Sequence, residues 1–352
     1  MENKNNKAQK KAVVQPTKEK VERDKRLEEL NQLRISTMTV LPPEKSIINV
    51  EGVPIFEQRD IGALKGKQKC GKTSVLKVLV STWIKGDLFG LESELKNAKI
   101  LWIDSEQKPH DVKQILDDIM QMTCLDAKYI DSHLRLYTVR TLSCKTLIND
   151  IELLINDLHP NVIIIDGLVD LVESFNDEAQ SHLVINRLIQ MCDVYKCSII
   201  GVLHENKSND DRNMRGHLGT MLAQKAGTVL ECKKDSNNVI TVSCSDSRHR
   251  AMPDWRIKYD EFGHIVSADG NQITPAEQEM MRRIEIIRNF VQEKGGEISR
   301  KELTDKLIKE LGRDRSTVSN IISKLVKNST LYEMKGKDKD MIGIQPLLDL
   351  TN

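Results

Sequence analysis

The segment from Gly66 to Thr73 constrains this chain more than any other stretch of its sequence. It reads G-x-x-x-x-G-K-T, follows the short, partly apolar run 61–65 and precedes a run with helical spacing at 74–80. The two glycines let the backbone turn its N–H groups inward, and the positive end of the following helix dipole adds to their attraction for an anion. The alternative is a chance glycine turn before a lysine-rich helix. The flanking runs favour a phosphate-binding loop, the P-loop.

The chemistry of a P-loop assigns roles to the side chains at its end. Lys72 supplies a positive charge for the β- and γ-phosphates of a nucleotide, and the Thr73 hydroxyl is a ligand for Mg²⁺. We therefore expect ATP as the nucleotide and Mg²⁺ as the cofactor. The expected nucleotide-binding residues are Gly66, Lys67, Gln68, Lys69, Cys70, Gly71, Lys72, Thr73 and Ser74.

From residue 61 to residue 203 the sequence alternates apolar runs of strand length with segments of helical spacing. The predicted strands after the P-loop are 99–104, 134–139, 161–166 and 197–203, and the predicted helices are 109–122, 143–158 and 177–195. Continuous apolar strands separated by helices indicate an α/β fold, a mostly parallel sheet with helices on both faces. Ligands of such a sheet bind at the carboxyl ends of its strands.

Polar residues stand at three of these carboxyl ends. Asp166 closes the most apolar strand and is expected to hold Mg²⁺ through water, although a helix-capping aspartate is the alternative. Glu106 is the candidate base that orients and deprotonates the attacking water. Asp104 competes for that role, and an acid favoured by the helix dipole is the plainer interpretation of Glu106. His204 ends its strand and is expected to sense the γ-phosphate.

The composition limits the class of protein. The chain has 352 residues, 39% of them hydrophobic and 30% charged, which suits one large globular domain and one small one. No apolar run approaches the roughly 20 residues of a membrane span, and the lysine-rich N-terminus has no apolar core of a secretory signal. Seven scattered cysteines without a C-x-x-C motif argue against zinc and favour the reducing cytoplasm. A net charge of +1 allows a nucleic-acid surface only as a local patch.

Two regions of different composition flank the α/β part. Residues 1–35 are basic, and we expect a disordered arm with a short helix near 21–33, either a solvated tail or an arm that touches nucleic acid. The ATPase domain is expected at 36–275, with a hairpin around 235–238. Residues 276–352 are expected to form a separate domain of three helices and two short strands.

The placement of Glu106, Asp166 and His204 resembles the RecA-like ATPase core, in particular the RepA-type hexameric helicases of plasmids and mobile elements. In that family the acid after the second core strand is catalytic, and a His or Gln at the position of His204 couples the nucleotide to DNA. The resemblance covers about residues 50–265 and implies a catalytic role for Glu106, Lys72 and His204.

The polar loop at 207–216 resembles the family's Arg-Gly-containing DNA loop. This resemblance implies that Lys207, Arg212 and Arg215 contact single-stranded DNA. Such contacts are dominated by phosphate charge, so the affinity is expected to fall with salt.

The run Ser247-Arg248-His249-Arg250 follows the second strand of the predicted hairpin. Related ring helicases carry a basic-x-Arg pair at a comparable place, where it reaches the nucleotide of the neighbouring subunit. The resemblance implies that Arg250 is this catalytic finger, that Arg248 is its partner, and that the chain forms a homo-oligomeric ring, a hexamer in the family. The segment lacks the lysine and glycine pattern of the DnaB branch. Which arginine acts therefore stays open, with a solvent-facing basic turn as the alternative.

The C-terminal region resembles a winged-helix domain, with 314–327 as its recognition helix. Polar residues on this helix are candidates for contacts to duplex DNA: Arg315, Ser316, Thr317 and Lys324. Winged helices also dock proteins, so both kinds of partner stay open.

Together these features predict an ATP hydrolase that acts on DNA as a helicase-like motor in the replication or transfer of a plasmid or mobile element. Replication or mobilisation proteins are further expected partners, and a membrane is not. One alternative is an ATP-switched DNA-binding regulator or replication loader that does not translocate. Another is a P-loop kinase of small molecules, which would need neither the basic loop nor the C-terminal region.

Overall fold

The computed structural model describes residues 18–43, 45–206, 214–248, 252–260, 263–269, 275–312, 314–327, 331–333 and 341–343. It divides the chain into two compact units, Met1–Pro43 and Glu44–Asn352. The first unit contains the helix α1 (Lys18–Gln32), none of whose side chains is buried. This helix coincides with the one expected near 21–33.

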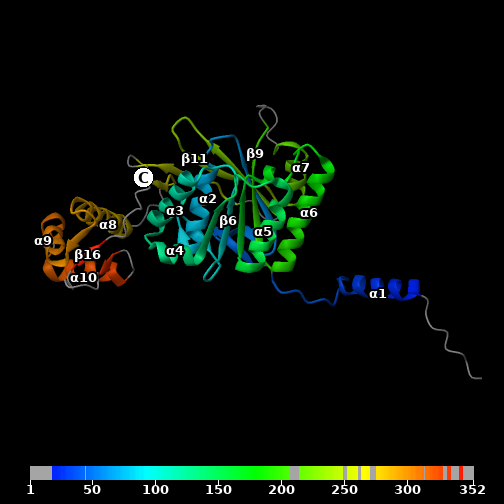
Figure 1. Ribbon diagram of the computed structural model, residues 1–352, viewed down its shortest axis with the longest axis horizontal. Coiled ribbons are helices and arrows are strands. Elements are labelled where there is room, and N and C mark those ends of the chain that lie inside the picture. The colour runs from blue at the N-terminus through cyan, green and yellow to red at the C-terminus, as the bar shows by residue number, and fades with distance from the viewer. Residues whose placement is uncertain are drawn as a thin grey trace, which may run out of the picture. The chain divides into compact units, whose positions relative to one another are not determined.

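A nine-stranded sheet in the second unit carries the P-loop (Figure 1). Its order is β13-β12-β11-β10-β3-β9-β8-β6-β7, parallel from β10 through β7 and antiparallel from β10 through β13. The strands are β3 (Ile61–Gly66), β6 (Ile100–Asp104), β7 (Leu134–Thr138), β8 (Val162–Asp166), β9 (Ser198–His204), β10 (Thr228–Lys234), β11 (Ile240–Ser247), β12 (Trp255–Tyr259) and β13 (Ile265–Ser267).

Helices cover both faces of this sheet (Figure 1). Side chains of alternate residues on β6 enter different cores: Ile100 and Trp102 pack with one helical layer, and Leu101 and Ile103 with the other. The first layer is α2 (Lys72–Lys85) and α3 (Pro109–Thr123), and the second is α5 (Cys144–Leu158), α6 (Glu178–Tyr195) and α7 (Gly216–Lys225). No helix in the described part of the chain is long and apolar enough to span a bilayer.

The strand order is that of a RecA-like fold, because β9 lies between the P-loop strand β3 and the aspartate-ending strand β8. The predicted α/β class with a mostly parallel sheet is therefore confirmed. The sequence analysis missed several short elements: α4 (Ala127–His133), the 3-10 turn η1 (Leu168–Leu171), α7 and β13.

A second, four-stranded sheet was also missed. Its order is β2-β1-β5-β4, from β1 (Ser46–Val50), β2 (Val53–Glu57), β4 (Asp87–Leu88) and β5 (Leu91–Ser93). The indole of Trp83, near the end of α2, donates a hydrogen bond to the Ile47 carbonyl at 3.1 Å. This contact joins the second sheet to the helix that begins at the P-loop.

The C-terminal region has its own apolar core, in which Leu303, Val318 and Ile322 are fully buried. Its elements are α8 (Pro275–Glu293), β14 (Glu297–Ser299), α9 (Arg300–Leu311), α10 (Arg315–Lys327), β15 (Tyr332–Glu333) and β16 (Met341–Gly343). The three strands pair in the order β14-β16-β15. The three predicted helices and two predicted strands are present, and β14 is an addition.

Candidate active site

The P-loop runs from Gly66, the last residue of β3, to Lys72, the first residue of α2. Gly71 has a φ of 100°, in the left-handed region, and a Cβ there would lie 2.5 Å from a methyl carbon of Ile240. A Cβ at Gly66 would lie 2.5 Å from the carbonyl oxygen of Cys232. Both glycines are thus required by backbone geometry and by close packing against β10 and β11.

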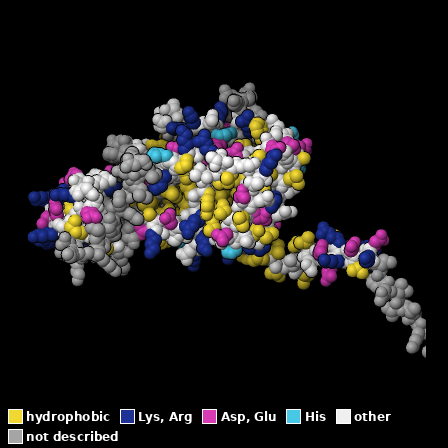
Figure 2. Space-filling view, viewed as in Figure 1, with side chains coloured by type: hydrophobic (Ala, Val, Ile, Leu, Met, Phe, Trp, Pro, Cys, Tyr) yellow, Lys and Arg dark blue, Asp and Glu magenta, His cyan; other side chains and the backbone are white. Residues whose placement is uncertain are grey.

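The edge of the sheet that holds the P-loop is positively charged. Figure 2 shows Lys and Arg side chains gathered near the positions labelled β9 and β11 in Figure 1. Four exposed lysines belong to the P-loop and the end of β10: Lys67, Lys69, Lys233 and Lys234. Such an edge attracts the negative charge of nucleotide phosphates.

The Lys72 ammonium is buried and has three partners. Its Nζ donates to the carbonyl oxygens of Gly66 at 3.2 Å and Lys67 at 3.0 Å, and it lies 3.0 Å from Nδ1 of His204. An ammonium has three donors and no acceptor, so Nδ1 must accept and the neutral ring carries its proton on Nε2. The structure therefore joins Lys72 and His204, which are 132 positions apart in sequence.

The other ring nitrogen of His204 faces Glu106. His204 Nε2 lies 3.4 Å from Glu106 Oε1. The hydrogen bond from His204 lowers the pKa of Glu106, with the charges of His204 and Lys72 acting in the same direction against burial. Glu106 thus remains a carboxylate at neutral pH, the form that can accept a proton.

Asp104, the rival for the base, is committed to the loop that carries Glu106. Its Oδ1 accepts from the backbone N–H groups of Glu106 at 3.1 Å and Gln107 at 2.7 Å, and its Oδ2 accepts from the Gln107 side chain at 2.7 Å. The side chain is completely buried, and burial raises its pKa. This arrangement makes Asp104 a positioning residue for Glu106.

Asp166 ends β8, directly beside β6, and its side chain is also buried. Burial, followed by the charges of Asp104 and Glu106, raises its pKa to about 8, and Lys72 opposes this shift. A buried carboxylate surrounded by negative charge suits a divalent cation, because oxygen ligands of this kind are those that Mg²⁺ prefers. Asp166 and Thr73 are the residues that would hold it.

The first turn of α2 makes a contact that the sequence did not indicate. Ser74 Oγ and the hydroxyl of Tyr259 on β12 lie 2.6 Å apart, across 185 positions of sequence. Tyr259 is 40% exposed, so its ring borders the open side of the site. No local pattern could have indicated this tyrosine, because only the antiparallel extension of the sheet brings β12 to α2.

The predicted DNA loop begins and ends beside His204. Lys207 and Arg212 lie outside the described residues. The backbone N–H of Arg215 donates to the His204 carbonyl at 3.0 Å, and Glu205 forms an isolated bridge with Met214. The guanidinium of Arg215 stacks over the Phe175 ring, 4.3 Å from its centroid.

Arg248 is far from the P-loop of its own chain. Its backbone N–H donates to the Gly227 carbonyl and its Nη2 to the Lys225 carbonyl, both at 2.9 Å. Gly227 precedes β10, whose residue Cys232 pairs with Gly66, and five residues of strand span about 16 Å at roughly 3.3 Å per residue. Arg250 lies outside the described residues.

In the C-terminal region, the first turn of α10 is held by a local cap. Asp314 accepts from the backbone N–H of Thr317 at 2.9 Å and from the hydroxyls of Ser316 and Thr317. Arg315 lies 3.4 Å from Asp305 on α9. The side chain of Lys324 lies outside the described part. Contacts of these residues to DNA remain predictions.

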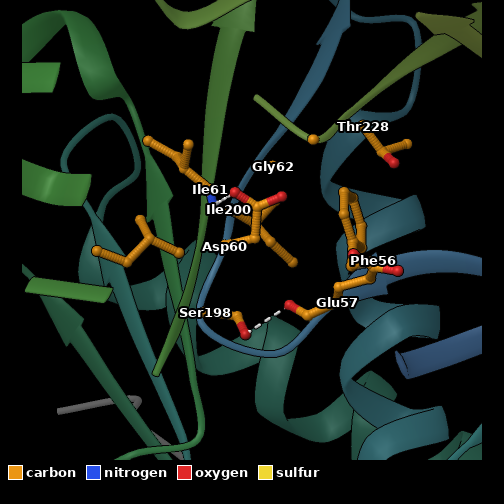
Figure 3. A pocket seen from close by; sticks show the side chains of 10 residues that line it. Phe56, Glu57, Asp60, Ile61, Gly62, Ser198, Ile200 and Thr228 are labelled. Carbon is orange, nitrogen blue, oxygen red and sulfur yellow. Dashed lines mark hydrogen bonds between the residues drawn. The ribbon is translucent and has the colours of Figure 1, made fainter. Parts of the chain in front are cut away.

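A small pocket lies at the opposite ends of the same strands (Figure 3). It is lined by residues such as Asp60, Ile61 and Ser198, and it has a volume of about 10 Å³. The Ser198 hydroxyl donates to the Glu57 carbonyl at 2.8 Å, as Figure 3 shows. A cavity of this size has room for no more than a single water, so it is a packing detail and not a ligand site.

Comparisons with known proteins place the chain in a family. The sequence profile of the AAA domain family matches residues 25–210, just over half of the chain. Two solved structures are similar to it: one described as an ATPase domain (14% identity, 70% of this chain and 98% of that chain covered, TM-score 0.46), and the KaiC-like protein PH0186 from Pyrococcus horikoshii OT3 (13%, 65% and 99%, TM-score 0.46). A search of curated proteins found no match. Because one continuous match spans the P-loop, Glu106, Asp166 and His204, this chain belongs to the AAA domain family.

Proposed function

We propose that this protein hydrolyses ATP and uses the reaction to move on single-stranded DNA. In the hydrolysis step Glu106 orients the attacking water and accepts its proton, and Lys72 neutralises charge on the phosphates. Thr73 and Asp166 hold Mg²⁺, which supplies further charge neutralisation when bound. The lowered pKa of Glu106 supports this role, since a base must be deprotonated at neutral pH.

The contacts of Lys72 suggest how the site responds to a nucleotide. All three of its donors face partners: two P-loop carbonyls and His204. A phosphate that takes Lys72 as a partner must replace at least one of them. Replacement of His204 would release the imidazole from its acceptor role and change its contact with Glu106. His204 would thereby report the presence of the γ-phosphate.

One observation carries the coupling to DNA: the loop predicted to bind DNA begins and ends at His204. The His204 carbonyl accepts from Arg215 N–H, and the next residue, Glu205, donates its N–H to the Gly66 carbonyl at 3.2 Å. Gly66 also accepts from Lys72. A shift of His204 or of the P-loop would therefore act directly on both ends of the loop at 207–213.

We further propose that the protein works as a ring, in the replication or transfer of a plasmid or mobile element. The contacts of Arg248 support action on a neighbouring subunit, because they hold it about 16 Å along the strand from its own P-loop. The resemblance to the RepA-type helicases supports a hexamer.

The test is ATP turnover by the purified protein with and without single-stranded DNA, followed by strand separation on a forked duplex. The proposal expects DNA-stimulated turnover and ATP-dependent separation. His204→Ala should retain basal turnover in part and lose the stimulation, whereas His110→Ala, an exposed histidine at the start of α3, should behave as the wild type. Turnover that is indifferent to DNA would contradict the motor.

The C-terminal region supports one other candidate. Three helices with a three-stranded sheet form an independent core, which also suits an ATP-switched DNA-binding regulator or a replication loader. Such a protein would show ATP-dependent binding of duplex DNA or of a replication protein without strand separation. The forked-duplex assay distinguishes it from the motor.

A further inference from the structure

Two cysteines meet where the P-loop packs on the sheet. Cys70 is the residue before Gly71 and is 6% exposed, and Cys232 lies on β10 and is 1% exposed. Cys232 pairs in register with Gly66, the first residue of the P-loop. Their meeting is not needed by the mechanism proposed above, which assigns no step to a thiol.

The contacts between the two cysteines run in both directions. Cys232 Sγ donates to the Cys70 carbonyl at 3.2 Å. A Cβ built on Gly66 would lie 2.6 Å from Cys70 Sγ and 2.5 Å from the Cys232 carbonyl oxygen, so the Cys70 side chain lies against the backbone of Cys232. The two thiols also hydrogen-bond to each other. Gly66 therefore packs against both cysteines at the start of the P-loop.

We propose that Cys70 and Cys232 are a peroxide-oxidised dithiol whose disulfide closes the P-loop to nucleotide. The inference rests on the proposed function only in that the P-loop binds ATP, and it is independent of DNA. It adds a modification site to the nucleotide-binding loop.

The step is balanced with hydrogen peroxide as the oxidant. Cys70 thiolate attacks one peroxide oxygen, the O–O bond breaks, and the hydroxide that leaves takes up a proton, which gives a sulfenic acid and water. The Cys232 sulfur then attacks the Cys70 sulfur, the S–S bond forms as the S–O bond breaks, and a second water leaves with the Cys232 proton. The two thiols lose two electrons in total, and peroxide is reduced to two molecules of water.

The surroundings favour Cys70 as the sulfur that reacts first. The hydrogen bond from Cys232 and then the charge of Lys72 lower the pKa of Cys70 to about 7, against burial and the charge of Glu205. The same hydrogen bond, followed by burial, raises the pKa of Cys232. Cys70 also adjoins the exposed P-loop residues Lys67–Lys69, so a peroxide reaches it from the nucleotide side. Bound MgATP should therefore slow the oxidation.

The disulfide should disturb the loop because the sulfurs must approach to bonding distance. Cys232 Sγ has to leave the Cys70 carbonyl, and residue 70 has to move toward β10. The backbone N–H groups that face phosphate would move with it. A displacement of about 1 Å in a positioned site can cost on the order of 10²-fold, and we expect a loss of nucleotide affinity of about that size.

The experiment uses the full-length chain, reduced and then freed of reductant. Hydrogen peroxide is titrated with and without MgATP, remaining thiols are alkylated, and the 70–232 linked peptide is quantified by mass spectrometry. Binding of a fluorescent ATP analogue is measured on the same samples and again after dithiothreitol. The matched variant is Cys232→Ser, which keeps a donor toward the Cys70 carbonyl but cannot form the disulfide; Cys232→Ala replaces it if the serine variant does not fold. The control is Cys192→Ala/Cys197→Ala, which removes the other buried pair of hydrogen-bonded thiols.

The expected result is a 70–232 linkage that MgATP slows, that lowers affinity about 10²-fold and that dithiothreitol reverses, in both the wild type and the Cys192/Cys197 control. Cys232→Ser should keep its affinity at the peroxide dose that links half of the wild type. The proposal is overturned if no linkage forms, if the linked protein binds the analogue normally, or if Cys232→Ser loses affinity equally. Reduced protein that binds no ATP overturns the proposed function instead, while the linkage is still read by mass.

Discussion

Asp104 and Asp166 face each other in register on the neighbouring parallel strands β6 and β8. Both side chains are buried, yet they have different tasks. Hydrogen bonds from Glu106 and Gln107 occupy both oxygens of Asp104, whereas the pKa of Asp166 is governed by burial and by neighbouring charges. The pair therefore separates the positioning of the base from the binding of the cation.

The raised pKa of Asp166 makes stability depend on pH in the absence of Mg²⁺. The folded state holds a proton on Asp166 up to a pH of about 8, and the unfolded chain releases it near pH 4. The folded protein thus binds more protons between these values, and its stability falls as the pH rises through this window, by up to about 1.4 kcal/mol per pH unit. Asp166→Asn should remove this part of the slope and unfold at a higher temperature than the wild type at pH 8 without metal. Thermal unfolding with EDTA from pH 5 to 8.5 measures it. Equal slopes in both proteins would contradict the assignment.

The division of labour between Glu106 and Asp104 predicts different failures. Glu106→Gln should bind ATP normally and hydrolyse it about 10² to 10⁴ times more slowly, because only the proton acceptor is lost. Asp104→Asn should lower turnover and thermal stability together, since an amide cannot accept all three of the present hydrogen bonds in the same geometry. Nucleotide binding, single-turnover hydrolysis and unfolding temperature distinguish the two. A stable Asp104→Asn protein that binds but cannot hydrolyse, beside an active Glu106→Gln, would make Asp104 the base.

The partners of Lys72 predict the result of removing it. Lys72→Ala should abolish turnover and weaken nucleotide binding, because the charge that faces the phosphates is lost. Thr73→Ala should retain some binding but lose its dependence on Mg²⁺. Lys96→Ala, an exposed lysine after β5, is the matched control. Turnover near the wild-type value in Lys72→Ala would remove the ATPase assignment.

Arg250 separates a ring from a solitary switch. If it acts on the nucleotide of the next subunit, Arg250→Ala should bind ATP normally and hydrolyse it poorly, and fingers of this kind contribute about 10³ to 10⁵ in rate. Mixing Arg250→Ala with Lys72→Ala should restore part of the activity, because some interfaces then pair an intact P-loop with an intact arginine. Co-purification of differently tagged subunits must first establish mixed assembly.

The same mixing experiment tests Arg248. Its guanidinium holds the end of α7 through the Lys225 carbonyl, so Arg248→Ala should lower the unfolding temperature as well as the activity. Co-assembled mixtures that stay inactive at every ratio would show that Arg250 acts within its own chain or structurally. A monomer with full DNA-stimulated turnover would count equally against the ring.

The sequence alone determined the elements and the ends at which chemistry sits. The P-loop was recognisable because its glycines, its lysine and its threonine are adjacent in the chain and their roles depend on backbone geometry. The strands before Asp166 and His204 were recognisable because burial on both faces demands continuous apolar runs, and a parallel sheet brings their carboxyl ends to one edge. The α/β class and the candidates Glu106, Asp166 and His204 followed from these local patterns.

Only the tertiary structure decided which of these residues touch. The contact between Lys72 and His204 depends on β9 lying beside β3, and no local pattern specifies that strand order. Asp104 and Glu106 could not be ranked from sequence, because the hydrogen bonds that occupy Asp104 form only once its loop is folded. Tyr259 and Cys232 reach the P-loop through the antiparallel extension of the sheet. Contacts of this kind join segments distant in the chain, and they exist only because folding buries the apolar faces between them.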